Sequence, residues 1–80
     1  MGKFKNQKAQ QGEKNLKNAD LSGENLSGIY LNQVNLRNAD LSDANLNGTN
    51  LCGSNLSGAN LCDADLNNSG LEFANLSELT

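Results

Sequence analysis

The sequence predicts an all-β fold of the solenoid type, in which short strands and corners wind the backbone around a column of leucines. From Leu16 onward a leucine stands at every fifth residue, thirteen times without a slip. The residue just before it is Asn or Asp in eleven of the thirteen units, and Tyr30 and Gly70 are the exceptions. The predicted core leucines are Leu16, Leu21, Leu26, Leu31, Leu36, Leu41, Leu46, Leu51, Leu56, Leu61, Leu66, Leu71 and Leu76.

A period of five residues fits neither a regular helix nor one long strand. In a helix each step of five rotates the side chain by about 140°, so the leucines would point all around the axis. In a strand they would alternate between the two faces, because five is odd. The pattern is satisfied when the leucine and the small residue two positions before it point inward, and the two polar residues after it turn the chain. One unit buries too little to offset its ordering entropy, so stacked units must stabilise one another.

Individual units such as "ADLSG" (19–23), "ANLNG" (44–48) and "ANLCD" (59–63) resemble the A(D/N)LXX motif of pentapeptide-repeat proteins. The resemblance runs in register over residues 14–78. It implies the fold of that family, a right-handed quadrilateral parallel β-helix with four units per coil. Thirteen units then make just over three coils, and residue n lies beneath residue n+20.

Two segments are expected, a repeat β-helix over residues 14–80 and a basic arm over residues 1–13. The arm is either disordered or folded over the first coil as a cap, and its candidate contact residues are Lys3, Lys5 and Lys8. Phe4 is a candidate cover for the leucines at that end. Without an apolar stretch long enough for a membrane span, or a hydrophobic signal region, the sequence predicts a cytoplasmic protein with reduced thiols.

Charge is distributed unevenly along the chain. Residues 1–37 hold all six cations and three acids, a net charge of +3, whereas residues 38–80 hold six acids and no cation. In the predicted register Asp20 lies under Asp40 and Asp43 under Asp63. These four acids are a candidate interaction strip, because like charges stacked in this way are unfavourable and the fold does not need them. The alternative is that Asp substitutes for Asn at solvated outward positions.

Both ends of the repeat carry residues that break its pattern. Lys14 and Glu24 fall at inward positions, and we expect an open first coil in which Glu24 meets Lys14, a lysine of the arm, or water. Tyr30 is expected to point outward as a candidate contact. At the other end an uncapped coil predicts end-to-end association or docking through Phe73 and Leu79; the alternatives are a frayed end, or Leu79 folding in as a lid.

The residue content argues against catalysis. The chain has no histidine, its acids lack a base partner, and no phosphate-binding glycine loop or zinc-binding cluster occurs. Cys52 and Cys62 are half a coil apart, so they are expected to face outward on opposite sides as free thiols, too distant for a disulfide. We therefore expect no enzyme, no cofactor and no metal.

The function predicted from these features is a rigid protein-interaction module that binds a protein partner through a face or a coil end. One alternative is a nucleic-acid-related regulator, acting by acidic mimicry along the strip or by contact of the lysine arm with phosphates. The branch of the family that inhibits DNA gyrase has many more coils, a longer acidic face and a C-terminal dimerisation helix, so direct resemblance to it is poor and a nucleic-acid partner is disfavoured. The other alternative is an element that assembles end to end as a homo-oligomer.

Overall fold

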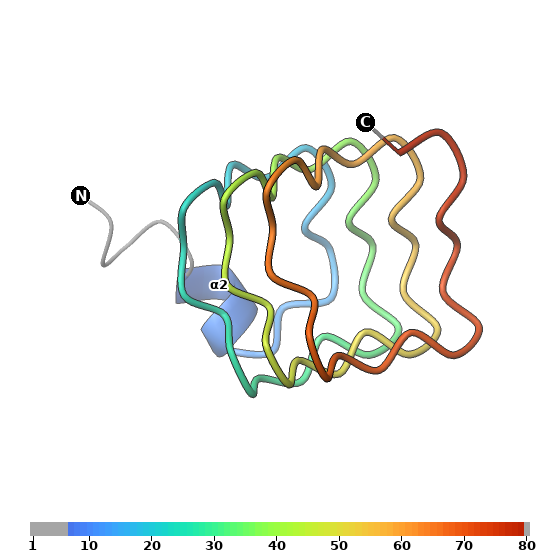
Figure 1. The fold of residues 1–80 in the computed structure, drawn as a ribbon. Helices are drawn as coiled ribbons and strands as arrows, with labels where there is room; N and C mark the ends of the chain where they lie inside the picture. Colours follow the sequence, from blue (N-terminus) through green and yellow to red (C-terminus); the bar gives the residue numbers. More distant parts are fainter. Residues whose placement is uncertain (1–6, 80) are drawn as a thin grey trace.

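The backbone winds into stacked coils, as seen in a computed structural model that describes residues 7–79 (Figure 1). One short helix, α2 (Gln7–Gln10), is present in this range and lies at the N-terminal end of the stack. Extended pairing consists of isolated parallel bridges, each joining a residue to the one twenty positions later. The nine bridges are Asn15 to Asn35, Asp20 to Asp40, Asn25 to Asn45, Tyr30 to Asn50, Asn35 to Asn55, Asp40 to Asn60, Asn45 to Asp65, Asn50 to Gly70 and Asn55 to Asn75.

Most five-residue units are held by hydrogen bonds to a neighbouring coil and by a bond within their own corner. The N–H of Leu41 donates to the carbonyl of Asn60 at 2.8 Å, and the N–H of Asp43 donates to the carbonyl of Cys62 at 2.9 Å. The N–H of Ala44 closes the corner by donating to the carbonyl of Leu41 at 3.1 Å. Because the partners between coils are nineteen or twenty-one residues apart, the strands pair in parallel with a fixed register of twenty.

The corners are turns with a left-handed residue at the second position after each leucine. At eleven of them the N–H of the third residue after the leucine donates back to the leucine carbonyl, the pattern of a type II turn, which needs a positive φ at its third residue. Ten of the thirteen left-handed residues are Gly, Asn or Asp, which tolerate this backbone best. The full set is Asn18, Gly23, Gly28, Gln33, Asn38, Asp43, Gly48, Gly53, Gly58, Asp63, Asn68, Phe73 and Glu78.

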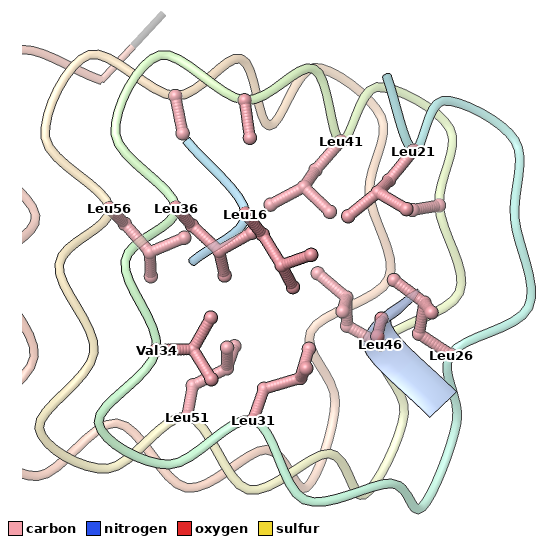
Figure 2. Packing of buried hydrophobic residues seen from close by; sticks show 14 residues of the cluster. Leu16, Leu21, Leu26, Leu31, Val34, Leu36, Leu41, Leu46, Leu51 and Leu56 are labelled. Carbon is pink, nitrogen blue, oxygen red and sulfur yellow. The ribbon is translucent and has the colours of Figure 1, made fainter. Parts of the chain in front are cut away.

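The leucines fill the centre of the coil, where Figure 2 shows them converging from its sides. Those from Leu16 to Leu56 are at most 3% exposed, and Val34, Ala39, Ala44 and Ala59 pack among them. Burial falls off toward the C-terminal end. There, Leu61, Leu66 and Leu71 are only partly buried, and Leu76, expected in the core, is 40% exposed. Within the described chain nothing is stacked over these last residues, which accounts for the difference.

At the corner after Leu31, a buried hydroxyl takes the place of the backbone hydrogen bond that closes most other corners. The N–H of Val34 points at the hydroxyl oxygen of Ser54 at 3.4 Å, and that hydroxyl donates to the carbonyl of Leu31. Ser54 therefore completes the corner of the coil beneath it while remaining 1% exposed. Thr49 makes a related contact, donating its hydroxyl to the carbonyl of Leu26 at 2.7 Å.

At the N-terminal end, the structure differs from the prediction that Lys14 points inward. Lys14 is exposed and its Nζ donates to the carbonyl of Asn32 at 2.8 Å, so it binds a backbone acceptor at the edge of the first coil instead of Glu24, which is half-buried. Ala9 of α2 is 2% exposed and belongs to the leucine cluster. Lys8 is exposed on α2, whereas Lys3, Phe4 and Lys5 lie outside the described residues.

Truncating a central leucine is expected to destabilise the fold far more than truncating a terminal one. Leu41→Ala removes a side chain that is 0% exposed and should lower the free energy of unfolding by about 2–5 kcal/mol. Leu76→Ala, at a site 40% exposed, should cost about 1 kcal/mol or less. Urea denaturation of both variants measures this; equal losses would contradict a core centred between Leu16 and Leu56.

Removing the Ser54 hydroxyl is expected to leave two buried backbone groups without a good partner. Ser54→Ala should therefore lower the free energy of unfolding by about 1–3 kcal/mol. The matched control is Ser69→Ala: Ser69 donates to the carbonyl of Leu66 at 2.7 Å, but its own N–H also donates to that carbonyl. The control should therefore cost less than about 1 kcal/mol. A Ser54→Ala protein as stable as the control would show that the corner at Leu31 does not need the hydroxyl.

Candidate interaction surface

Most of the outward polar residues have a structural role in the turns. The side-chain oxygen of Asn35 accepts the N–H of Arg37 at 3.1 Å, and the Oδ1 of Asp40 accepts both the N–H and the hydroxyl of Ser42, at 3.0 and 2.6 Å. Such contacts are Asx turns, which start the corner. They recur at Asn15, Asp20, Asn25, Asn45, Asn50, Asn55, Asn60, Asp65 and Asn75. These eleven positions are the eleven units with Asn or Asp before the leucine.

The geometry of the corners explains why Asp or Asn stands at the four positions of the candidate acidic strip, but it does not explain why the residue is Asp. Asp20 and Asp40 are joined by a backbone bridge and start Asx turns. Asp43 and Asp63 occupy left-handed corners with φ of 60°, a conformation that Asp and Asn favour. The fold therefore gives all four residues a reason to be Asp or Asn. An Asn side chain offers the same Oδ1 acceptor and tolerates the same left-handed corner, so the turn geometry does not require a negative charge at these positions.

The large exposed apolar side chains lie on the remaining faces and at the C-terminal end. Tyr30 is 75% exposed and borders a shallow hollow beside α2, which is also lined by Ala9, Gly12 and Ile29. Phe73 is 96% exposed and Leu79 is 38% exposed. Tyr30 replaces the Asn or Asp of its unit and so cannot form an Asx turn.

A hydrogen bond between a thiol and a carboxylate joins neighbouring coils within one column of the surface. The Sγ of Cys52 donates to Oε1 of Glu72 at 3.1 Å. This hydrogen bond is the main cause that raises the pKa of the Cys52 thiol above its usual value, and it lowers the pKa of the Glu72 carboxyl. Cys52 and Cys62 are both free. Sequence reasoning missed the contact, although the spacing of twenty residues places Cys52 and Glu72 in one column.

Within residues 7–79, no group of three or more His, Cys, Asp or Glu side chains is arranged to hold a metal ion. None of the helical structure in that range is long and apolar enough to cross a membrane. The candidate residues lie on the outside of the coils, with Asp40 half-buried and the others exposed: Asp20, Asp40, Asp43 and Asp63 on one side, Tyr30 near α2, and Phe73 and Leu79 in the last twenty residues.

Comparison with known proteins agrees with the register of twenty. A family model described as pentapeptide repeats (8 copies) matches residues 15–51 and 44–78. The chain belongs to the pentapeptide-repeat family. Proteins of this family form right-handed quadrilateral β-helices, and the bridges between residues n and n+20 are those of four five-residue units per turn of such a helix.

Solved structures of this pentapeptide-repeat chain's relatives come from cyanobacteria and a plant. The pentapeptide repeat protein alr5209 from Nostoc Pcc 7120 is 38% identical, with a TM-score of 0.57, over 75% of this chain and 54% of that one. The protein AT2G44920 from the Arabidopsis thaliana thylakoid lumen is 30% identical, with a TM-score of 0.62, over 80% and 48%. HetL from Nostoc sp. Strain PCC 7120, involved in heterocyst differentiation regulation, is 30% identical, with a TM-score of 0.51, over 81% and 35%.

The match therefore spans about half or less of the length of these solved proteins. Among curated protein sequences, none matches the chain.

The contact between Cys52 and Glu72 predicts a difference in thiol reactivity. The thiolate is the nucleophile, so a raised pKa should slow alkylation of Cys52 near pH 8, and Glu72→Gln should speed it severalfold and shift its pH profile to lower pH. The measurement is the rate of iodoacetamide labelling in a Cys62→Ser background, where Cys52 is the single thiol. Cys62, measured in a Cys52→Ser background, should not respond to Glu72→Gln. Unchanged labelling of Cys52 would contradict the contact.

Proposed function

We propose that this pentapeptide-repeat chain is a rigid, non-enzymatic interaction module of about three coils, which binds a protein partner through a face or a coil end. The observation that carries the proposal is the ladder of parallel bridges, which fixes every outward residue in a column with a register of twenty. A partner can therefore meet a preformed array of side chains, with little ordering entropy lost on binding. The similarity to HetL, a protein involved in regulation, supports the same class of function.

The ends and location of the module are part of the same proposal. Residues 1–13 act as a cap or basic arm at the N-terminal end, which the burial of Ala9 of α2 supports. We place the protein in the cytoplasm. No cofactor is needed, because binding rests on the shape and charge of the outer columns.

Two other functions use specific features of the same surface. Acidic mimicry of a nucleic acid, or a contact of the arm with phosphates, would use the uneven charge, with six acids and no cation in residues 38–80. End-to-end assembly would use the last twenty residues, where Leu76 and Leu79 are 40% and 38% exposed. The first predicts binding that weakens steeply with salt, and the second predicts association that depends on protein concentration.

An isosteric variant separates these functions. Replacing Asp20, Asp40, Asp43 and Asp63 together by Asn removes four negative charges but keeps an Oδ1 for each Asx turn and a residue that tolerates each left-handed corner. We expect thermal stability equal to or above that of the unmodified protein, because like charges at adjacent levels are removed.

The variant and the unmodified protein are then immobilised and used to capture proteins from an extract of the source cell. We expect both to retain the same protein partner at high salt and in the presence of competing duplex DNA. Loss of a DNA-binding protein in the variant alone would favour mimicry instead. As a further control, the unmodified protein lacking residues 1–13 shows whether the arm takes part.

A further inference from the structure

Phe73 occupies a backbone conformation that is unfavourable for its side chain. It lies at a left-handed corner with φ of 63°, and a bulky residue with a positive φ is an outlier. Ten of the other twelve corners in the series use Gly, Asn or Asp. A phenylalanine here therefore makes the corner less stable than the residues found elsewhere in the same repeat.

The side chain of Phe73 gains no packing in return. It is 96% exposed, so its ring contributes nothing to the leucine core. Gln33, which breaks the rule at the same corner two coils earlier, does pack against its neighbour in the column. Its Cγ lies over Gly53 of the next coil, where an added Cβ would be only 3.3 Å away. Strain and exposure at one residue, without a contact that offsets them, are features of binding sites rather than of scaffolds.

The surface around Phe73 is acidic. Glu72 precedes it, and Glu78 occupies the next corner of the same coil; both are exposed. The hydrogen bond from Cys52 lowers the pKa of Glu72, so its carboxylate stays ionised at neutral pH. Residues 38–80 contain no lysine or arginine to neutralise these charges. A partner at this corner is therefore favoured when it carries positive charge.

We propose that Phe73 anchors a lysine- or arginine-rich segment of a partner protein, whose aliphatic side chains pack on the ring while its cationic groups meet the carboxylates of Glu72 and Glu78. A second copy fits less well. Two C-terminal ends would bring Glu72 and Glu78 of both copies together, and the N-terminal end of another copy is covered by α2. This inference rests on the proposed function as a protein-interaction module and names the surface and partner chemistry.

The decisive variant is Phe73→Asn, because folding and binding should respond in opposite directions. Relief of the left-handed strain should raise the melting temperature by about 2–6 °C. Loss of the aromatic anchor should weaken binding at least tenfold. Gln33→Asn is the matched control, since it relieves a left-handed corner with φ of 59° in the same column and should leave binding unchanged. A Phe73→Asn protein that melts at a lower temperature would mean that the ring serves the fold, and would overturn the proposal.

Binding is measured with peptides selected from a phage-displayed library of random short sequences on the unmodified full-length protein. We expect enrichment of lysine or arginine beside valine, isoleucine or leucine, and loss of these peptides on Phe73→Asn. Selected peptides that bind Phe73→Asn as tightly as the unmodified protein would overturn the anchor while leaving the interaction module in place. Selection of acidic or uncharged peptides would overturn the partner chemistry. Failure to select any peptide would overturn the inference and leave the proposed function, which the capture experiment tests with whole proteins.

Charge and self-association are tested separately. Glu72→Gln with Glu78→Gln should weaken peptide binding severalfold and reduce its salt dependence. The control pair Glu13→Gln with Asp65→Asn removes the same charge elsewhere while keeping each side chain's turn acceptor, and should change neither. Equal effects of the two pairs would contradict a local acidic contact.

Sedimentation at increasing concentration should show no association that depends on Phe73; dimers lost in Phe73→Asn would assign the surface to a second copy and overturn the proposal.

Discussion

The register of twenty residues between neighbouring coils is the constraint on which the rest of the structure depends. A single five-residue unit orders its backbone at a cost of roughly 5–10 kcal/mol, while one buried leucine returns about 1.5–3 kcal/mol. Parallel bridges from Asn15 to Asn35 and onward supply the remaining stabilisation only when a coil has a neighbour. Burial follows the same rule: the leucines between Leu16 and Leu56 are enclosed, and exposure increases toward Leu76.

The same register divides the surface into structural and available side chains. An Asn or Asp before the leucine uses its Oδ1 to start a turn, as Asn35 does for Arg37. The residue two after the leucine must tolerate a positive φ, as Asp43 does. Much of the polar surface is thus required by the corners. The corners do not require the negative charge of the aspartates or the ring of Phe73, and the proposals for binding are based on these features.

Sequence reasoning was most informative where the repeat is regular and least informative where it breaks. The spacing of the leucines indicated a coil with inward leucines, and the family resemblance supplied the four sides; the parallel bridges have that register. Lys14 was placed at an inward position by its phase, but its long side chain turns to the carbonyl of Asn32 at the edge of the first coil. For the stacked aspartates the sequence left two interpretations, an interaction strip or substitution of Asp for Asn at outward positions. It did not predict the turn bonds to Ser22 and Ser42, which depend on corner geometry that a pattern of residue types does not specify.

The sequence by itself determined which side chains face inward, because a strict period of five gives every leucine the same place in its strand and corner. The distance of twenty residues between stacked positions was implied by the family resemblance and not by the period alone. Only the tertiary structure decided which polar atoms are engaged. The hydroxyl of Ser54 completes a corner of the coil below it, and Glu72 accepts from the thiol of Cys52 across one turn of the helix. Both contacts join residues twenty or more apart in sequence, and their formation depends on the rise, the rotamers and the φ of each corner. The sequence placed Phe73 among the outward contact candidates, but its positive φ depends on the geometry of the folded corner.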